Sequence, residues 1–319
     1  MKKLTSSISI MFLMIAITWM GCESTTSVSE DEMVSAIMEL VESDSTITLD
    51  GIGDGGAIEE EYEYDGELIK AVMDTFPESY WLVRFGRKLS GQISREFDVE
   101  VEGDSAYVMV TTTMTGDFKV VLLDTANHTI EDSISKPFTQ ISKQQILVRR
   151  FRRTDNPRRN WRVIGFSPIL SRSVGNTIEI TDLLVESDSN DFSLSLSNDS
   201  EDSILDRFLS RDELPVLRPW QRYHVELGVS NPDPFYYEPG EGAIVHYGLK
   251  RHILKFRRPL RDPENDDTFE GYIRIHRGSP RMCRIFFDLI DLASIFDTDA
   301  PFNSVFWALP YRARHNQHQ

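Results

Sequence analysis

The densest group of chemically useful side chains is a run of arginines near the middle of the chain. Seven lie within fourteen residues: Arg149, Arg150, Arg152, Arg153, Arg158, Arg159 and Arg162. A guanidinium fork matches phosphate and carboxylate oxygens, and basic clusters also bind lipid headgroups. The cluster could therefore take phosphate, lipid headgroups or an acidic partner. The alternative is a solvated hairpin whose arginines pair with acids of the same chain, for instance those of residues 59–65.

A second group is acidic. Asp262, Glu264, Asp266 and Asp267 place oxygens at spacings that a calcium ion could use. However, Pro263 stiffens this loop, no glycine makes the sharp bend of an EF-hand, and no glutamate stands at the expected later position. An acidic hairpin loop is the simpler interpretation, so we expect no metal here.

Histidines and nucleophiles form no recognisable catalytic pattern. The seven histidines are residues 128, 224, 246, 252, 276, 315 and 318, and none forms His-Glu-x-x-His. The chain has no Gly-x-Ser-x-Gly elbow, no phosphate loop and no cysteine pair with zinc spacing. The sequence therefore assigns no catalytic residue, no metal and no cofactor.

The amino terminus has the layout of an export signal. Met1-Lys2-Lys3 is followed by an uncharged apolar stretch from Ile8 to Met20. These 13 residues are too few to span a bilayer core, which needs about 20 in a helix, but they fit a secretory signal. Gly21-Cys22 and a polar string rich in Ser and Thr come next.

A small residue followed by cysteine at this point resembles the lipobox of bacterial lipoproteins, although Trp19 and Met20 depart from its usual residues. The resemblance implies that residues 1–21 are a signal peptide and that Cys22 carries lipid, including palmitate. Residues 22–30 would then be a tether. We expect a lipid-anchored protein of the cell envelope, on the periplasmic face of a membrane or on the cell surface. An ordinary secretory signal, or an uncleaved anchor, is the alternative.

Composition restricts the class of protein. Removing residues 1–21 takes away two lysines and no acid, so the formal charge changes from -17 to -19. Such a chain repels the phosphate backbone, which argues against general nucleic-acid binding. Its 40% hydrophobic residues are typical of a folded protein, and its length favours two domains. If Cys22 is acylated, Cys283 cannot pair with it, and we expect Cys283 to be a small buried hydrophobe.

The pattern in the first half of the sequence predicts helices followed by strands. Apolar residues at helical spacing predict a helix over residues 30–42, and a second helical region is expected between residues 67 and 89. The acidic, glycine-containing segment 49–66 indicates a loop. Apolar residues then alternate with polar ones, interrupted by turns at residues 102–104 and 115–117. The closing hairpin combines residues 144–153 with residues 160–166.

This order of elements, with its last strand NWRVIGF, resembles the cone-shaped domain of the nuclear transport factor 2-like superfamily. The resemblance covers residues 31–170 and implies an α+β domain, helices then an antiparallel meander, with a bent sheet around a pocket. Glu96 and Asp98 flank Phe97 on one strand and are the first candidates for polar groups in that pocket. A solvated strand face is the alternative.

The second half predicts only strands. We place the boundary at residues 171–176, and short alternating strands run from there towards residue 312. The segments RPWQRYHVELGVSNP and NDDTFEGYIRI are similar to those of bacterial envelope immunoglobulin-like modules. The expectation is an all-β immunoglobulin-like sandwich over residues 171–312, followed by a frayed tail at residues 313–319.

These observations favour a non-enzymatic envelope protein that binds or scaffolds another component. Its contacts would be the membrane, through Cys22, and an envelope protein partner. An enzyme or small-ligand carrier that uses a pocket in the first domain is the alternative. A deep pocket with a shifted carboxylate would favour that alternative, whereas an interior filled with aromatic side chains would favour the scaffold.

Overall fold

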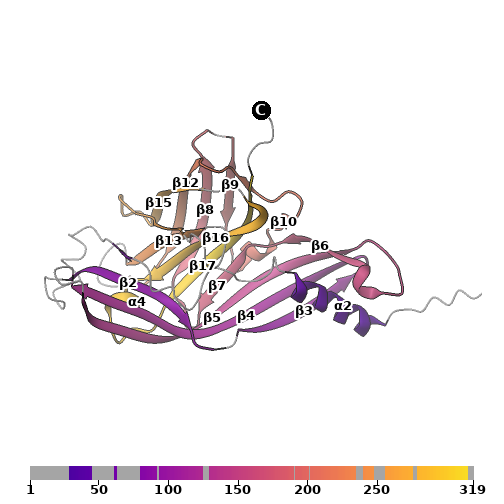
Figure 1. Cartoon of the computed structure of the whole chain (residues 1–319), viewed down its shortest axis with the longest axis horizontal. Coiled ribbons are helices and arrows are strands. Elements are labelled where there is room, and N and C mark those ends of the chain that lie inside the picture. The colour runs from indigo at the N-terminus through magenta and orange to yellow at the C-terminus, as the bar shows by residue number, and fades with distance from the viewer. Residues whose placement is uncertain are drawn as a thin grey trace, which may run out of the picture.

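In a computed structural model the chain forms one long, curled antiparallel sheet with a smaller sheet packed on it (Figure 1). The structure describes residues 29–44, 61–62, 80–91, 93–124, 129–189, 191–200, 202–234, 240–247, 256–275 and 279–314. The expected signal peptide, Cys22, most of the expected tether and histidines 128, 252, 276, 315 and 318 lie outside the described residues. So do most of the 49–66 loop and of the 67–89 region, and the last five residues of the tail.

The large sheet has thirteen described strands. Along its main path the order is β1 (Glu61–Tyr62), β2 (Tyr80–Leu89), β4 (Ser105–Asp124), β5 (Thr129–Arg150), β7 (Ile169–Ser173), β17 (Ser304–Ala313), β16 (Ser279–Asp291), β13 (Glu241–Tyr247) and β14 (Phe256–Pro259). Four further strands pair beside this path: β3 (Ser94–Glu102) with β4, β6 (Trp161–Phe166) with β5, β10 (Leu209–Ser210) with β6, and β11 (Val216–Leu217) with β17.

The hairpin of β4 and β5 is the spine of the molecule, because both strands are long enough to take two partners in succession. The first half of β4 pairs with β3 up to Thr113, and its second half pairs with β2 from Gly116 onward. Strand β5 likewise pairs with β7 in its middle and with β6 near its end. The sheet therefore divides into two branches that share these two strands. The first branch contains β3 and β6, and the second contains β2, β7, β17, β16, β13 and β14.

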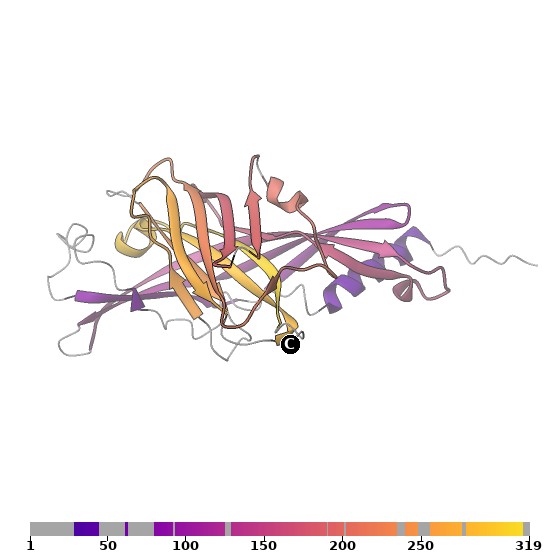
Figure 2. The same ribbon diagram turned by 90° about the horizontal axis from the view of Figure 1, so that it is seen from above.

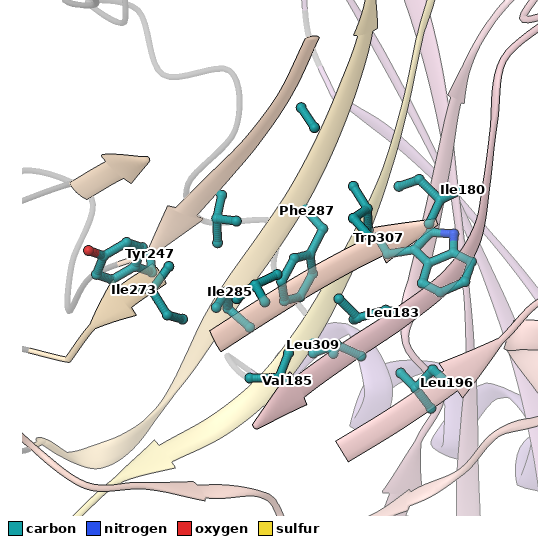
Figure 3. Packing of buried hydrophobic residues seen from close by; sticks show 14 of the residues in the cluster. Ile180, Leu183, Val185, Leu196, Tyr247, Ile273, Ile285, Phe287, Trp307 and Leu309 are labelled. Carbon is teal, nitrogen blue, oxygen red and sulfur yellow. The ribbon is translucent and has the colours of Figure 1, made fainter. Parts of the chain in front are cut away.

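The smaller sheet covers one face of the second branch. Its order is β15 (Thr268–Arg274), β12 (Arg222–Ser230), β8 (Glu179–Ser187) and β9 (Ser193–Ser197). Alternate residues of β8 and β12 point inward, as period-2 patterning requires, and pack on β13, β16 and β17. Figure 3 shows Leu183 and Val185 facing Phe287, Trp307 and Leu309 across this core. The two layers pack face to face as in a β-sandwich.

The opposite face of the same branch lines the inside of the curl. Phe302, which precedes β17, lies with its ring centroid 4.6 Å from that of Phe118 on β4 and 5.4 Å from that of Phe138 on β5. Ile290 of β16 and Ile295 of the short helix α4 (Ala293–Phe296) belong to the same cluster. Strands far apart in the sheet order thus face each other across an aromatic core.

Helix α2 (Glu30–Ser43) covers the first branch, at the end remote from the small sheet (Figure 2). Ser29 caps it: its hydroxyl accepts from the Glu32 backbone N–H and the Glu32 carboxylate accepts from the Ser29 backbone N–H, both at 3.2 Å. Ile37 and Val41 are fully buried against β4, β5 and β6. The predicted helix over residues 30–42 is confirmed.

The predicted fold class is wrong. The protein is predominantly β, and the described residues contain two α-helices, not a helical layer over a meander. Residues 80–89, expected to be helical, form strand β2, and the expected turn at residues 115–117 is the middle of β4. Tertiary pairing overrode local preference, because β2 gains its hydrogen bonds from β4.

The second half is not a separate immunoglobulin-like sandwich either, because β13, β16 and β17 belong to the large sheet. Strand β7, which spans the boundary expected at residue 171, pairs with β5 on one side and with β17 on the other. The sheet therefore continues from one half of the chain to the other. The division into residues 31–170 and 171–312 stays a prediction about folding units.

Candidate functional site

The predicted arginine cluster lies at the end of the molecule where β5 passes into β6 (Figure 1). Two short elements shape this end: the β3–β4 turn and the connection of residues 151–160, which contains the 3-10 helix η2 (Pro157–Arg159). Asn160 fixes the connection by accepting from the Thr154 backbone N–H at 2.8 Å and donating to the Thr154 carbonyl at 2.9 Å. Arg152, Arg153, Arg158 and Arg159 thus project from a hydrogen-bonded connection, and the other three arginines lie on the strands at either side of it.

Three of the seven arginines are held by the protein's own groups. Arg150 lies 4.7 Å above the ring of Trp161 and 3.6 Å from Asp104, and Arg153 lies 3.4 Å from the same carboxylate. Arg158 forms an ion pair of 2.6 Å with Glu39 of α2. These contacts bind the hairpin to the helix and to the β3–β4 turn. They match the internally paired alternative, although with acids other than those of residues 59–65.

The other four are Arg149, Arg152, Arg159 and Arg162, and all are exposed. Within the described part of the chain, no carboxylate lies within ion-pair distance of any of them. Arg149 and Arg162 stand directly opposite each other on β5 and β6. Like charges placed directly opposite in an antiparallel pair destabilise it, so this pair weakens the hairpin unless an anion neutralises it.

An exposed aromatic ring accompanies these two arginines. Phe151 is 54% exposed, and the Arg162 guanidinium lies 5.4 Å from its ring centroid. Val148 and Val163, the neighbours of Arg149 and Arg162 along their strands, are buried under α2. Because side chains alternate along a strand, Arg149 and Arg162 point away from α2. At its end this face offers two guanidinium groups and one aromatic ring to an anionic partner, and Glu100 and Glu102 of β3 are exposed farther along the same face.

A second cluster, which the sequence did not indicate, lies inside the curl. Arg87 of β2 donates to both carboxylate oxygens of Asp288 on β16, at 2.7 and 2.8 Å, and to the Ser304 hydroxyl at 3.0 Å. His246 Nε2 of β13 lies 3.2 Å from Asp288 Oδ2. Asp288 is fully buried and Arg87 is 6% exposed. This is a bidentate buried ion pair with a histidine on the shared carboxylate.

Electrostatics fix the protonation states in this cluster. Burial alone would raise the pKa of Asp288, but the charge and hydrogen bonds of Arg87, with the contact to His246, hold that pKa well below its usual range. Burial lowers the pKa of His246 to about 4, against the opposing effect of Asp288. At neutral pH the cluster is therefore a carboxylate, a guanidinium and a neutral imidazole.

The arrangement resembles a Ser-His-Asp triad in composition but not in geometry. Such a triad needs a serine hydroxyl on the histidine, whereas the Ser304 hydroxyl accepts from Arg87 and, at 3.3 Å, from the Gln140 amide. The cluster ties together strands from both ends of the sheet order. Its geometry supports a structural clamp. Asp288, standing between Phe287 and Leu289, was the signal that could have pointed to it.

A third polar group closes the far end of β13 and β16. Glu241 and Asp291 stand directly opposite each other and are both buried. Burial raises the pKa of each. Glu241 accepts from the Asn231 amide at 2.9 Å, and Asp291 accepts from the Asn303 amide and from the Ala293 backbone N–H, both at 3.0 Å. Within the described part of the chain no three His, Cys, Asp or Glu side chains gather as a metal-binding group.

The remaining sequence candidates are dispersed. Glu96 and Asp98 are exposed on the outer face of β3, so the pocket interpretation is wrong for them. The carboxylate of Asp262 accepts from the backbone N–H groups of Asp266 and Asp267, at 3.2 and 3.1 Å, and so closes its own loop. Cys283 is buried in the core between the sheets, as expected. His224 packs against Tyr272 on the outer face of the small sheet.

Comparisons with known proteins give no family for this chain: no family model matches the sequence, and no curated protein matches it. Across the described ranges, no helix has the length and apolar character to cross a membrane. The functional argument therefore rests on the residues themselves.

Proposed function

We propose that this chain is a lipid-anchored cell-envelope protein that acts without catalysis and binds an anionic group through its arginine-rich end. The observation that carries the proposal is the exposed pair Arg149–Arg162, set directly opposite each other beside Phe151. A destabilising like-charge pair held on an ordered hairpin is the arrangement expected where an anion completes the site.

The interior of the curl supports binding rather than catalysis. The space enclosed by β2, β4, β5 and β16 holds Phe85, Phe118, Phe138 and Phe302. Asp288, a buried carboxylate of this interior with a strongly lowered pKa, is neutralised by Arg87 in a bidentate contact. An acid–base catalyst needs a group poised near the working pH, and this carboxylate is shifted in the opposite direction.

The anchor is tested by replacing its thiol. We expect wild-type protein to incorporate labelled palmitate and to sediment with membranes. We expect Cys22→Ser to lose the label and to appear as soluble or unprocessed protein. Unchanged palmitate labelling of Cys22→Ser would refute the anchor.

The anion site is tested on phosphocellulose, a phosphate-bearing resin. The mature chain, formally at -19 after the loss of residues 1–21, should be retained only if a local basic site overcomes its overall repulsion. We expect Arg149→Ser/Arg162→Ser to elute at much lower salt. The matched control is Arg258→Ser/Arg261→Ser, which removes two exposed arginines elsewhere. Equal effects of the two double variants would contradict the site.

A further inference from the structure

We propose that the arginine-rich end docks on the anionic headgroups of the membrane that holds the lipid anchor. The proposal rests on the proposed function, since it names the partner of that same site. Its first support is position. Helix α2 begins at Glu30, and Met33 in its first turn contacts Arg150 at the end of β5. The described part of the chain therefore begins at the end that carries the arginines (Figures 1 and 2).

The length of the tether adds a distance limit. Seven residue steps separate Cys22 from Ser29, and even a fully extended chain covers only about 25 Å in seven steps. The anchored protein thus keeps this end near the headgroup layer whatever path the tether takes. A short tether also raises the effective concentration of headgroups at the arginines. An acidic protein that diffuses freely would not have this advantage.

The chemistry of the exposed face fits a lipid surface. Guanidinium forks suit lipid phosphate oxygens, and an aromatic ring suits the interface between headgroups and acyl chains. Arg149, Arg162 and Phe151 supply these groups together. They point away from α2, and therefore away from its acidic first turn, Glu30, Asp31 and Glu32. Docking by this face would turn the acids of α2 away from the anionic surface. Glu100 and Glu102 of β3 are exposed on the same face as Arg149, so the contact is confined to the end of the hairpin that carries the arginines and Phe151.

The consequence of docking is a fixed orientation. Acyl chains alone hold a protein at a surface but leave it free to tumble on its tether. A second contact through Arg149, Phe151 and Arg162 would hold the long axis of the sheet in one orientation relative to the membrane. The four-stranded sheet lies away from α2 along that axis (Figure 2) and would then be presented at a set distance from the membrane.

Binding is measured by co-sedimentation of the mature chain, residues 22–319 with Cys22→Ser, so that no acyl chain contributes. The vesicles are phosphatidylcholine alone, or phosphatidylcholine with phosphatidylglycerol. We expect binding only to the anionic vesicles and its loss as salt rises from about 0.1 to 1 M. Arg149→Ser/Arg162→Ser should weaken binding more than tenfold, since each basic residue near such a surface contributes about fivefold. Adding Phe151→Ser to this double variant should weaken vesicle binding further.

The control Arg258→Ser/Arg261→Ser should bind within about twofold of the parent, since its arginines lie on and after β14, away from the docking end. Melting temperatures of all variants establish that they fold. Equal binding to both vesicle types, or equal loss in both double variants, would overturn the proposal. A third outcome would also overturn the proposal: the protein is retained on phosphocellulose and crosslinks to an envelope protein through Arg149 and Arg162, but it does not bind vesicles. That last result would leave the anion site standing and assign it to an acidic protein.

A second measurement uses the lipidated full protein in vesicles. Trypsin cleaves after arginine, so docking should protect residues 149–162 in anionic vesicles and not in neutral ones. Protection that is equal in both kinds of vesicle contradicts docking. A chain that does not carry lipid at all would fail at the palmitate experiment instead, so the two proposals fail separately.

Discussion

Arg87 and Asp288, 201 residues apart, form a bidentate ion pair in the interior of the curled sheet. In the order of the sheet, four strands separate β2 from β16, namely β4, β5, β7 and β17. The pair therefore joins strands that hydrogen bonding between neighbours would leave far apart. It is the polar counterpart of the aromatic packing of Phe118 on Phe302.

Breaking this pair from either side should destabilise the protein strongly. We expect Arg87→Met or Asp288→Asn alone to lower the free energy of unfolding by about 3–5 kcal/mol, because each leaves a buried partner uncompensated. The double variant Arg87→Met/Asp288→Leu should recover much of that loss. Urea denaturation of all three variants measures the coupling; additive losses would show that the two residues do not depend on each other.

His246 should make the protein sensitive to acid below neutral pH. Its pKa is about 4 in the folded state and 6.5 as the reference, so between these values the unfolded chain binds the extra proton. Its contribution is complete above pH 6.5 and falls as the pH drops towards 4, by up to about 3 kcal/mol. Denaturation at a series of pH values measures this effect. The free energy of unfolding of His246→Gln should fall less steeply between pH 6.5 and 4 than that of the wild type.

Glu241 and Asp291 act in the opposite sense, because burial raises the pKa of each. Their folded state holds the proton more tightly, so their contribution is greatest at low pH and is lost as the pH rises through the folded pKa. We expect Asp291→Asn to remove part of that loss above the pKa. A stability profile for Asp291→Asn that is parallel to wild type across the acid range would contradict this assignment.

Gly116 should tolerate no side chain. It lies where β4 changes partner from β3 to β2, and a Cβ atom there would come within 2.2 Å of the Lys88 carbonyl oxygen. We expect Gly116→Ala to cost about 2 kcal/mol, since the neighbouring backbone must move. The control is Thr115→Ala at the exposed neighbouring position, which should leave the melting temperature close to wild type.

Calcium should have no effect on the acidic loop. The Asp262 carboxylate is engaged by two backbone N–H groups of its own loop, so a cation would have to displace them. We expect no change in melting temperature on adding calcium to about 1 mM, a range in which extracellular calcium modules bind. A clear rise that is lost in Asp262→Asn would contradict the prediction.

Several elements could be predicted because their signal is local. The helix at residues 30–42 has both an apolar stripe and a capping box, and strands β8, β9, β12 and β15 have clean alternation with turn residues between them. Such patterns need no knowledge of distant residues. The arginine cluster was visible for the same reason, since its members are close in sequence.

The sequence by itself determined which segments are amphipathic, where the arginines are dense, and that the first residues have the composition of an export signal. Only the tertiary structure decided that β4 continues through residues 115–117, that residues 80–89 form a strand, and that Arg87, His246 and Asp288 meet. The physical reason is that strand pairing and burial are non-local. A residue's partner in a sheet, and the cost of burying its charge, depend on chain segments that are distant in the sequence, as Asp288 is from Arg87.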